Sequence, residues 1–344
     1  MRANPGRWVQ NGPMDAERAI RLAGANGVPV ESLALYGRWW QFEVWVRQLA
    51  YVVLRAAAGT TWETRLSKRA VAYAANDDLW HLVGPDQPDL LGYLDFAQLL
   101  KLIEHDWALF EPFLLQRVVW DGRAVEMRSI RNGVGHVRRP AARDRERVEQ
   151  LLADLEPGFR EMLRAISTRP IDAGRWSGNP VVADYATGRL GDARDHLQRK
   201  YGFEVELGVS EMPWTKDSPP PADPSGVAGS FWHLSIGGPD RFVDPSSLAR
   251  MIEPVRDNVV YVLAGNAFGA QVAVPAVDKV DEVLRALTHF ALGYPSCTLP
   301  LERVTMEEAE TWPGDVTSLD SRILIEHPFA TAPSADAPGS IFGV

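Results

Sequence analysis

The most constraining stretch of the sequence is residues 35–59, LYGRWWQFEVWVRQLAYVVLRAAAG, which is apolar almost throughout. Trp39, Phe42 and Val46 recur at helical spacing, and the opposite face carries further large apolar side chains. A helix that is apolar on two faces needs other elements around it to be stable in water. The segment therefore predicts a helix at the centre of a bundle, with Gly59 as its C-cap.

Helical periodicity continues from residue 14 to residue 168 and predicts an up-and-down bundle of five or six helices. Pro140 suits the first turn of a helix, and Pro157 is expected to separate two helices. Val125 and Ile130 are expected to face the core. The predicted helical segments are residues 14–25, 35–59, 63–77 after a capping box at Thr60-Thr61-Trp62-Glu63, 93–114, a segment from Asp121 into 127–140, 141–155 and 159–168.

The pattern changes after Pro170, where alternating strand-like runs and proline-rich loops begin. The predicted fold class is thus an N-terminal all-α helical bundle followed by an α+β domain with a mostly antiparallel sheet. The strand-like runs are residues 203–210, 230–238, 258–265, 269–275 and 321–329, and an amphipathic helix is predicted over 276–293. The predicted divisions are a helical extension over 1–32, the bundle over 33–170, an acidic α+β domain over 171–330 and a tail of disordered composition over 331–344.

Composition narrows the class of protein. Cys297 is the single cysteine, so the chain has no internal disulfide and no zinc site built on cysteine pairs. No apolar run of about 18 uncharged residues and no signal-type leader are found, which predicts a cytoplasmic protein that does not enter a membrane. The net charge of −9 argues against a protein that coats nucleic acid non-specifically.

The charge is unevenly spread along the chain. Residues 1–150 contain 20 Lys and Arg against 18 Asp and Glu, whereas residues 151–344 contain 16 against 27. Within residues 123–147, eight arginines stand against three acids. A local basic patch on an acidic protein attracts a phosphate backbone at one place, although many charge runs are only solvated helix surface.

The basic segment contains the motif Arg131-Asn132-Gly133-Val134-Gly135-His136, that is, R-N-x3-H. On a regular helix, five residues turn through about 500°, so Arg131 and His136 point about 140° apart. Either the two glycines break the helix and fold His136 back, or two copies of the motif meet across a symmetric dimer. Both arrangements bring the guanidinium and the imidazole to one phosphate.

These residue types match the cleavage of RNA through its own 2′-hydroxyl. Histidine titrates near neutral pH and serves as acid or base, and arginine binds phosphate oxygens bidentately while keeping its charge. Asn132 is suited to donate to a phosphate oxygen or to hold the turn. The reaction needs no metal ion and no cofactor.

The R-N-x3-H motif at the end of a late helix, together with RWWQFEVWVRQLAYVVLR and YLDFAQLLKLIEHDWALF, resembles the HEPN superfamily (higher eukaryotes and prokaryotes nucleotide-binding domain) over residues 33–168. The likeness is to members from bacterial toxin and anti-phage defence systems. It implies a metal-independent endoribonuclease that leaves a 2′,3′-cyclic phosphate and dimerises so that both motifs line one cleft. It also implies that Arg131, Asn132 and His136 are the catalytic residues. Single-stranded or loop RNA, tRNA among the candidates, is the expected substrate, because an exposed strand leaves its 2′-oxygen free to swing into line.

Further residues are assigned around this motif. Glu43, on an earlier helix, is the acidic residue that the resemblance implies beside the site, and Arg47 and Arg128 are further supporting candidates. The candidates for binding RNA are Arg138, Arg139 and Arg143. One toxin branch continues its motif as H-x-Y, the target of an antitoxin enzyme, whereas this chain reads His136-Val137-Arg138. The resemblance therefore implies an antitoxin or regulatory protein partner without fixing how it acts.

Two other interpretations stay open. The bundle is alternatively a non-catalytic dimerisation module, with the α+β domain acting as a ligand- or partner-binding sensor, and His136 is then only a helix cap. The acidic half is alternatively a cover for the basic patch that restrains the nuclease. Tryptophans 39, 40, 45 and 62 are expected to pack in the core, with stacking on bases as the alternative, and His233 is expected to be a half-buried packing residue.

Overall fold

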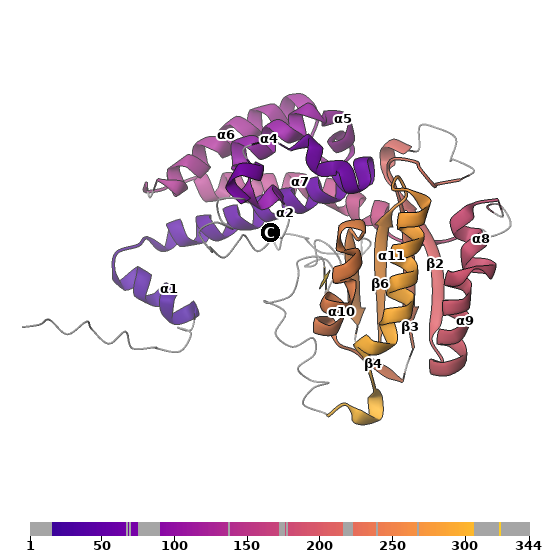
Figure 1. The fold of residues 1–344 in the computed structure, drawn as a ribbon. Helices are drawn as coiled ribbons and strands as arrows, with labels where there is room; N and C mark the ends of the chain where they lie inside the picture. Colours follow the sequence, from indigo (N-terminus) through magenta and orange to yellow (C-terminus); the bar gives the residue numbers. More distant parts are fainter. Residues whose placement is uncertain are drawn as a thin grey trace, which may run out of the picture.

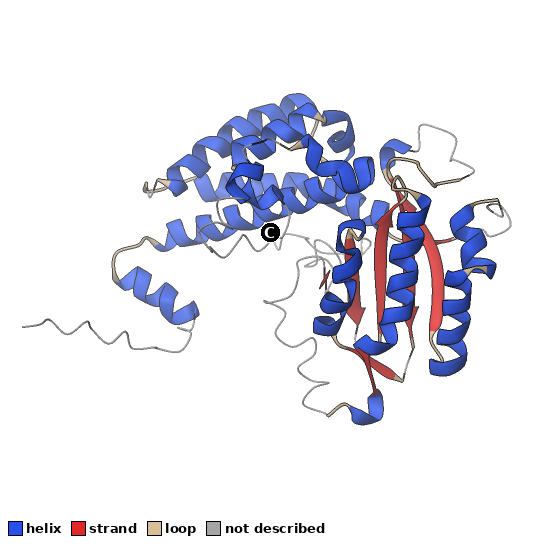
Figure 2. Ribbon diagram, viewed as in Figure 1, coloured by secondary structure: helices blue, strands red, loops and turns tan. Residues whose placement is uncertain are grey.

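A computed structural model of the 344-residue chain divides into a helical half and a half built on a β-sheet (Figures 1 and 2). The structure describes residues 16–66, 68, 70–74, 90–136, 138–171, 176, 178–215, 223–238, 240–266, 268–305 and 323–324. The predicted tail over 331–344 lies outside these residues, as do residues 216–222. None of the helices in the described part combines the length and apolar character that crossing a membrane requires.

The helical half is organised around one long central helix, α2, which contacts α4, α5, α6 and α7. Its large side chains, such as Trp39, Phe42 and Trp45, are buried among residues from those neighbours. The predicted all-α character of this half is confirmed. Its described elements are α1 (Ala16–Ala25), α2 (Val30–Ala58), η1 (Gly59–Arg65), η2 (Leu90–Tyr93), α4 (Phe96–His105), α5 (Trp107–Phe110), η3 (Glu111–Phe113), α6 (Arg117–Gly135) and α7 (Asp144–Ile166).

Helix α2 begins five residues before its predicted start and ends where the sequence predicts. Gly59 adopts φ 55, and its N–H donates to the carbonyl of Arg55. A Cβ at Gly59 would collide with the carboxylate of Asp278, so glycine is needed for the backbone angle and for the approach of the second half. The C-terminal end of α2 therefore faces the sheet-containing half.

Two local expectations around α2 are wrong. The capping box at Thr60-Thr61-Trp62-Glu63 does not form, because the N–H and the hydroxyl of Thr60 both donate to Asp278, at 2.8 and 3.2 Å. The segment 93–114 is not one helix, because it breaks at Asp106. A capping box that the sequence reading missed, between Asp95 and Gln98, opens α4.

Helices α6 and α7 differ from expectation at three residues. Pro157 lies inside α7, which runs unbroken because apolar side chains on both sides of the proline are buried in the same core. Pro140 precedes α7 by four residues and is not in its first turn. Ile130 is buried as expected, whereas Val125 is 66% exposed on the outer face of α6.

In the described residues, the main sheet of the second half has five antiparallel strands, which confirms the predicted mostly antiparallel sheet, and β8 adds a parallel edge to β5. The strand order is β1-β2-β3-β6-β5-β8. The strands are β1 (Arg169–Pro170), β2 (Glu204–Glu211), β3 (Ser230–Gly237), β5 (Tyr261–Asn266), β6 (Gly269–Pro275) and β8 (Ile323–Leu324), and β4 (Arg241–Val243) pairs separately with β7 (Thr298–Pro300). The helices are α8 (Pro180–Thr187), α9 (Arg189–Tyr201), α10 (Pro245–Ile252) and α11 (Val280–Gly293).

The two faces of the sheet have different partners. Neighbouring side chains of β3 point to opposite faces. Trp232 packs with the four helices of this half, and Phe231 joins the core of the bundle. Tyr261 and Ala273 also belong to the bundle core. The two halves are therefore joined through a continuous apolar core at one end of the sheet.

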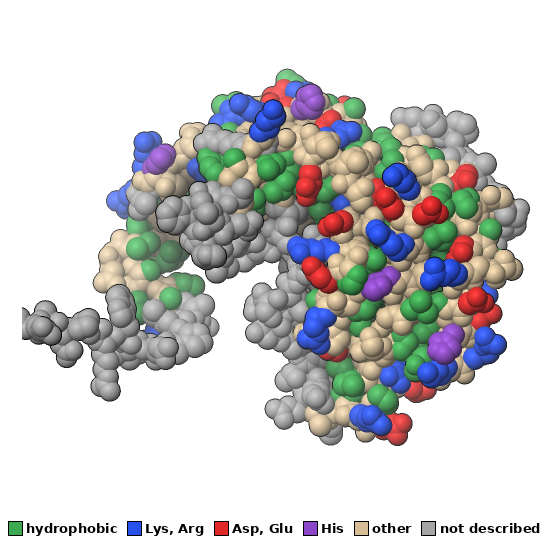
Figure 3. Space-filling model, viewed as in Figure 1, with side chains coloured by type: hydrophobic (Ala, Val, Ile, Leu, Met, Phe, Trp, Pro, Cys, Tyr) green, Lys and Arg blue, Asp and Glu red, His purple; other side chains and the backbone are tan. Residues whose placement is uncertain are grey.

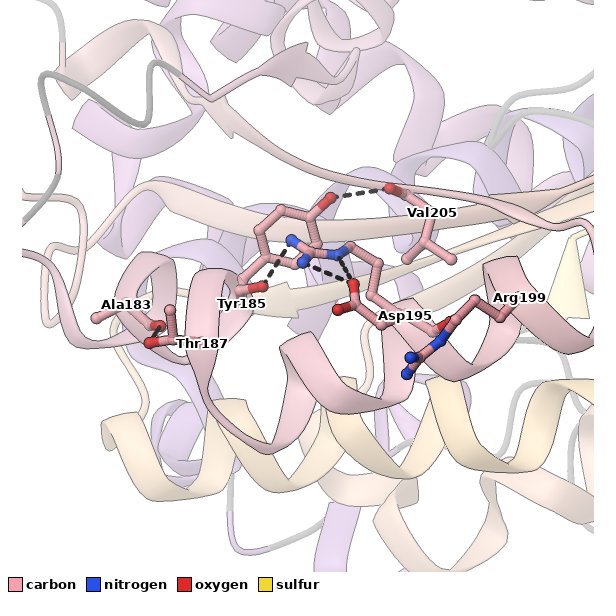
Figure 4. Close-up of polar contacts among 7 residues, drawn as sticks. Ala183, Tyr185, Thr187, Asp195, Arg199 and Val205 are labelled. Atoms are coloured by element: carbon pink, nitrogen blue, oxygen red, sulfur yellow. Dashed lines mark hydrogen bonds and ion pairs between the residues drawn. The ribbon is translucent and has the colours of Figure 1, made fainter.

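The α8–α9 hairpin is tied to the edge of the sheet by a polar cluster (Figure 4). The Tyr185 hydroxyl donates to the carbonyl of Val205 at 2.8 Å. Arg194 lies over the Tyr185 ring, donates to the Tyr185 carbonyl at 2.9 Å and pairs with Asp195 at 2.7 Å. The hydrogen bonds to Asp195 raise the pKa of the Arg194 guanidinium. The guanidinium of Arg194 therefore has a structural role.

Candidate functional site

The R-N-x3-H motif lies at the C-terminal end of α6. The helix continues through Gly133 and Gly135, and the N–H of His136 donates to the Asn132 carbonyl at 3.1 Å as the C-cap. The two glycines therefore do not break the helix, and the expectation that they fold His136 back is wrong. In a continuous helix Arg131 and His136 point about 140° apart.

Arg131 turns towards α2. A Cβ placed on Gly135 would lie 3.4 Å from Nη1 of Arg131, so the guanidinium covers that glycine. Beside it is an open cavity of about 310 Å³ between α2 and α6. The cavity is lined by Tyr36, Trp39, Trp40, Glu43, Val44, Arg47, Arg131, Val134 and Gly135. No ion pair or hydrogen bond of the Arg131 guanidinium is found among the described residues.

The supporting candidates Glu43 and Arg47 line the same cavity. Glu43 accepts a hydrogen bond from Nε1 of Trp39 at 2.9 Å and forms an ion pair with Arg47 one turn along α2. Arg47 also donates to the carbonyl of Leu91. The pair is thus held in place with its charges balanced, while the charge of Arg131 stays available. The structure brings Glu43, Arg47 and Arg131 together around one cavity.

Asn132 and His136 lie on a different, exposed face of α6. They are four residues apart, and Val118 and Val125 precede Asn132 at intervals of seven residues. These four positions lie within about 40° of one another around the helix. His136 does not line the cavity that holds Arg131. Within one chain, therefore, the two principal residues of the motif do not meet.

Arg128 is not part of this arrangement. Its side chain is half-buried, its Nε is buried without a hydrogen-bond partner, and it does not line the cavity. Its place in the structure gives no direct route to a ligand at Arg131.

The other arginines of the basic segment fall into two groups. Three of them form ion pairs with acids. Glu126 pairs with both Arg123 and Arg147, and Glu31 pairs with Arg145. Arg138, Arg139 and Arg143 are exposed, and no acidic partner is found for them within the described part of the chain. Arg138 and Arg139 line a second cavity, of about 670 Å³, beside the turn between α1 and α2. Figure 3 shows a histidine and Lys or Arg side chains exposed at this end of the helical half.

A second site-like contact was missed by sequence reasoning. Ser210 Oγ lies 2.7 Å from Nε2 of His233, and Nδ1 of His233 lies 2.7 Å from Nε2 of Gln271. The strand register opposes His233 to Gly208, so Ser210 is its diagonal neighbour, which no local sequence signal reveals. Ser210 and His233 are fully buried, and His233 is not the half-buried residue that was expected. A substrate has no access, so this contact is a structural network.

Metal ligation and similarity to known proteins add no further assignment. Within the described residues, no group of three or more His, Cys, Asp or Glu side chains is placed to hold a metal ion. Comparisons of the chain with protein-family models, with curated proteins and with solved structures return no match. Membership of the HEPN superfamily therefore stays a prediction that rests on the motif and on the helical half.

Proposed function

We propose that the protein is a metal-independent endoribonuclease whose site is built around Arg131 and His136. The observation that carries the proposal is an arginine with no partner among the described residues, in an open cavity, five residues before an exposed histidine. Other arginines nearby, such as Arg47, Arg123 and Arg147, are neutralised by acids, whereas the charge of Arg131 stays available to an anionic ligand.

The chemistry assigned to the site is transfer of the phosphate to the 2′-oxygen of the same nucleotide. His136 takes the proton from the 2′-hydroxyl or gives a proton to the 5′-oxygen that leaves. Arg131 binds the phosphate oxygens and stabilises the negative charge that grows on them. Asn132 orients the phosphate by donating from its amide. The products are a 2′,3′-cyclic phosphate and a 5′-hydroxyl.

The same proposal requires a homodimer. One chain separates Arg131 from His136 around α6, so a phosphate that contacts both must receive them from two chains. A twofold axis near the C-terminal end of α6 sets the exposed face of one chain, with His136, against the open cavity of the other chain, with Arg131, and the reverse. The exposed face is apolar and has few protruding side chains, because it carries Val118, Gly122 and Val125. His136 lies at the C-terminal end of the same face.

The wider setting is part of the proposal. Single-stranded RNA, tRNA among the candidates, is the proposed substrate, because an unpaired strand leaves its 2′-oxygen free to swing into line. Arg138, Arg139 and Arg143 extend the positive surface for the strand. We assign the protein to a cytoplasmic toxin or anti-phage defence role, restrained by an antitoxin or regulatory protein.

A nuclease assay in EDTA tests the proposal. Wild-type protein is expected to cleave single-stranded RNA with EDTA present and to leave 2′,3′-cyclic phosphate ends. His136→Ala and Arg131→Ala are each expected to lose about 100- to 10,000-fold in rate, the scale of a general acid or a charge-stabilising donor. His196→Ala, a matched exposed histidine in the other half, is expected to cleave normally. Cleavage that survives in the His136 variant counts against the assignment.

A second candidate function is favoured by the joint between the halves. Arg55 donates to the carbonyl of Asp257 at 2.7 Å, and Gly229 donates to the carbonyl of Ala56 at 2.7 Å. Both contacts hold the C-terminal end of α2. The turns of α2 that line the cavity, residues 36–47, lie nearer its other end. In this alternative the bundle only dimerises, and ligand or partner binding in the α+β half moves α2. Dimerisation and RNA binding without cleavage by the wild-type protein would support it.

The cover hypothesis for the acidic half receives no support from the described residues. The contacts of that half cluster at the Arg55–Thr60 end of α2. Helix α2 is about 43 Å long, so those contacts lie well away from the basic end of α6.

A further inference from the structure

We propose that the cavity between α2 and α6 is a subsite for one unpaired nucleotide, with its base stacked on Trp40 and its phosphate on Arg131. The proposal deepens the ribonuclease assignment, because the nucleotide would belong to the RNA substrate. It rests on that assignment only for the cleavage step, since binding of a base is measurable without cleavage.

The two adjacent tryptophans of α2 have opposite environments. Trp39 is 4% exposed, and its ring lies 5.4 Å from Phe42 and 4.7 Å from Phe96, in edge-to-face contact. Trp40 is 53% exposed, and no ring contact or hydrogen bond of its indole is found among the described residues. The expectation that all of these tryptophans pack in the core is therefore wrong for Trp40. Its indole face is available to a planar partner.

A second exposed ring lies one helical turn away. Tyr36 is 56% exposed and lines the same cavity as Trp40. Residues four apart on a helix share a face and lie about 6 Å apart along the axis. Two exposed aromatic rings on one wall are a typical base-stacking surface of proteins that bind single-stranded nucleic acid.

The opposite wall of the cavity supplies the charge. Arg131 comes from α6, lines the same cavity as the two rings of α2, and has no acidic partner among the described residues. The one carboxylate in the cavity, Glu43, is already paired with Arg47. A phosphate is therefore drawn to Arg131, and the base lies along the α2 wall. The Glu43 oxygens accept from the N–H groups that each base carries on its pairing edge.

The size of the cavity limits the ligand. A volume of about 310 Å³ is at the lower end of small-molecule sites, which suits one nucleotide and not a duplex. A base in this cavity must be unpaired and unstacked from at least one neighbour. The subsite therefore selects single strands and loops of RNA without reading a particular sequence.

The test measures binding of an RNA that cannot be cleaved. The probe is a short fluorescein-labelled RNA with every 2′-oxygen methylated, and its anisotropy is followed in EDTA. Trp40→Ala is expected to weaken binding about 5- to 150-fold, the range for loss of one base–aromatic stack. Trp40→Phe keeps a ring and is expected to recover much of the loss. The same strand annealed to its complement is expected to bind more weakly to the wild-type protein.

A control variant, Phe268→Ala, is measured in the same anisotropy assay. Phe268→Ala removes a ring that is 41% exposed in the β5–β6 turn of the other half, and it is expected to leave binding unchanged. Wild-type affinity in Trp40→Ala, equal loss in Phe268→Ala, or no binding of single strands by wild type each overturns the subsite. Trp40-dependent binding together with no cleavage of unmodified RNA would retain the subsite and overturn the ribonuclease.

Discussion

Substitution of Val125 by glutamate tests the proposed dimer face. Val125 is 66% exposed and Val118 is 77% exposed on the side of α6 that leads to His136. Burying a whole valine side chain contributes about 1.5–3 kcal/mol, so two thirds of one contributes about 1–2 kcal/mol. A twofold axis counts each contact twice, which gives about 2–4 kcal/mol per dimer. Loss of that burial raises the dimer dissociation constant about 30- to 700-fold, before the cost of a buried carboxylate is added.

Sedimentation equilibrium over a range of protein concentrations measures this constant directly. We expect wild-type protein to dimerise and Val125→Glu to be monomeric at the same concentrations, with loss of cleavage in parallel. Leu292→Glu is the matched control, because Leu292 is 58% exposed on α11 in the other half and should not affect assembly. An unchanged dimer constant in Val125→Glu, or a wild-type protein that stays monomeric, would refute the reasoning.

Two further predictions concern the buried groups of the second half. Burial raises the pKa of Asp278, so the charged carboxylate lowers the stability of the folded state at neutral pH. This loss of stability disappears as the pH falls through the raised pKa towards the ordinary Asp pKa of about 4. The stability of wild type relative to Asp278→Asn should therefore improve from pH 7 to pH 4.5 in urea unfolding, and a constant difference would show that the carboxylate carries no such cost. Burial also raises the pKa of Cys297 to about 11, so the folded protein should not react with a thiol reagent at pH 8, whereas the unfolded chain should react at once.

The division into a helical and a sheet-containing half was readable from the sequence because hydrophobic period is local information. Residues 35–59 needed a surrounding bundle, and that requirement predicted the central position of α2. Single residues that usually end or cap a helix predicted the helix boundaries less reliably. Pro157 reads as a helix break, yet apolar side chains before and after it share one core, and their burial outweighs the lost hydrogen bond. Thr60 reads as a cap, yet it bonds to Asp278, which is 218 residues away.

The candidate site was predictable only in part for the same reason. The motif around Arg131 is local, so the sequence alone reveals it, and the resemblance points to Glu43, which lines the same cavity. The neutralisation of Arg145 by Glu31 depends on the packing of α7 near the start of α2, and no periodicity contains it. The opposite environments of Trp39 and Trp40 also depend on the helices around α2, since neither residue type nor spacing distinguishes them.

The most direct test of the central claim is a subunit-mixing experiment. Arg131→Ala and His136→Ala are each expected to be inactive, because each homodimer lacks one of the two groups. After mixing and subunit exchange, mixed dimers contain one intact Arg131 from one chain and one intact His136 from the other. We predict that RNA cleavage in EDTA returns to about a quarter of the wild-type rate, since about half of randomly paired dimers are mixed and each mixed dimer has one intact site out of two. A mixture that exchanges subunits fully and stays as inactive as either variant would contradict a site shared between two chains.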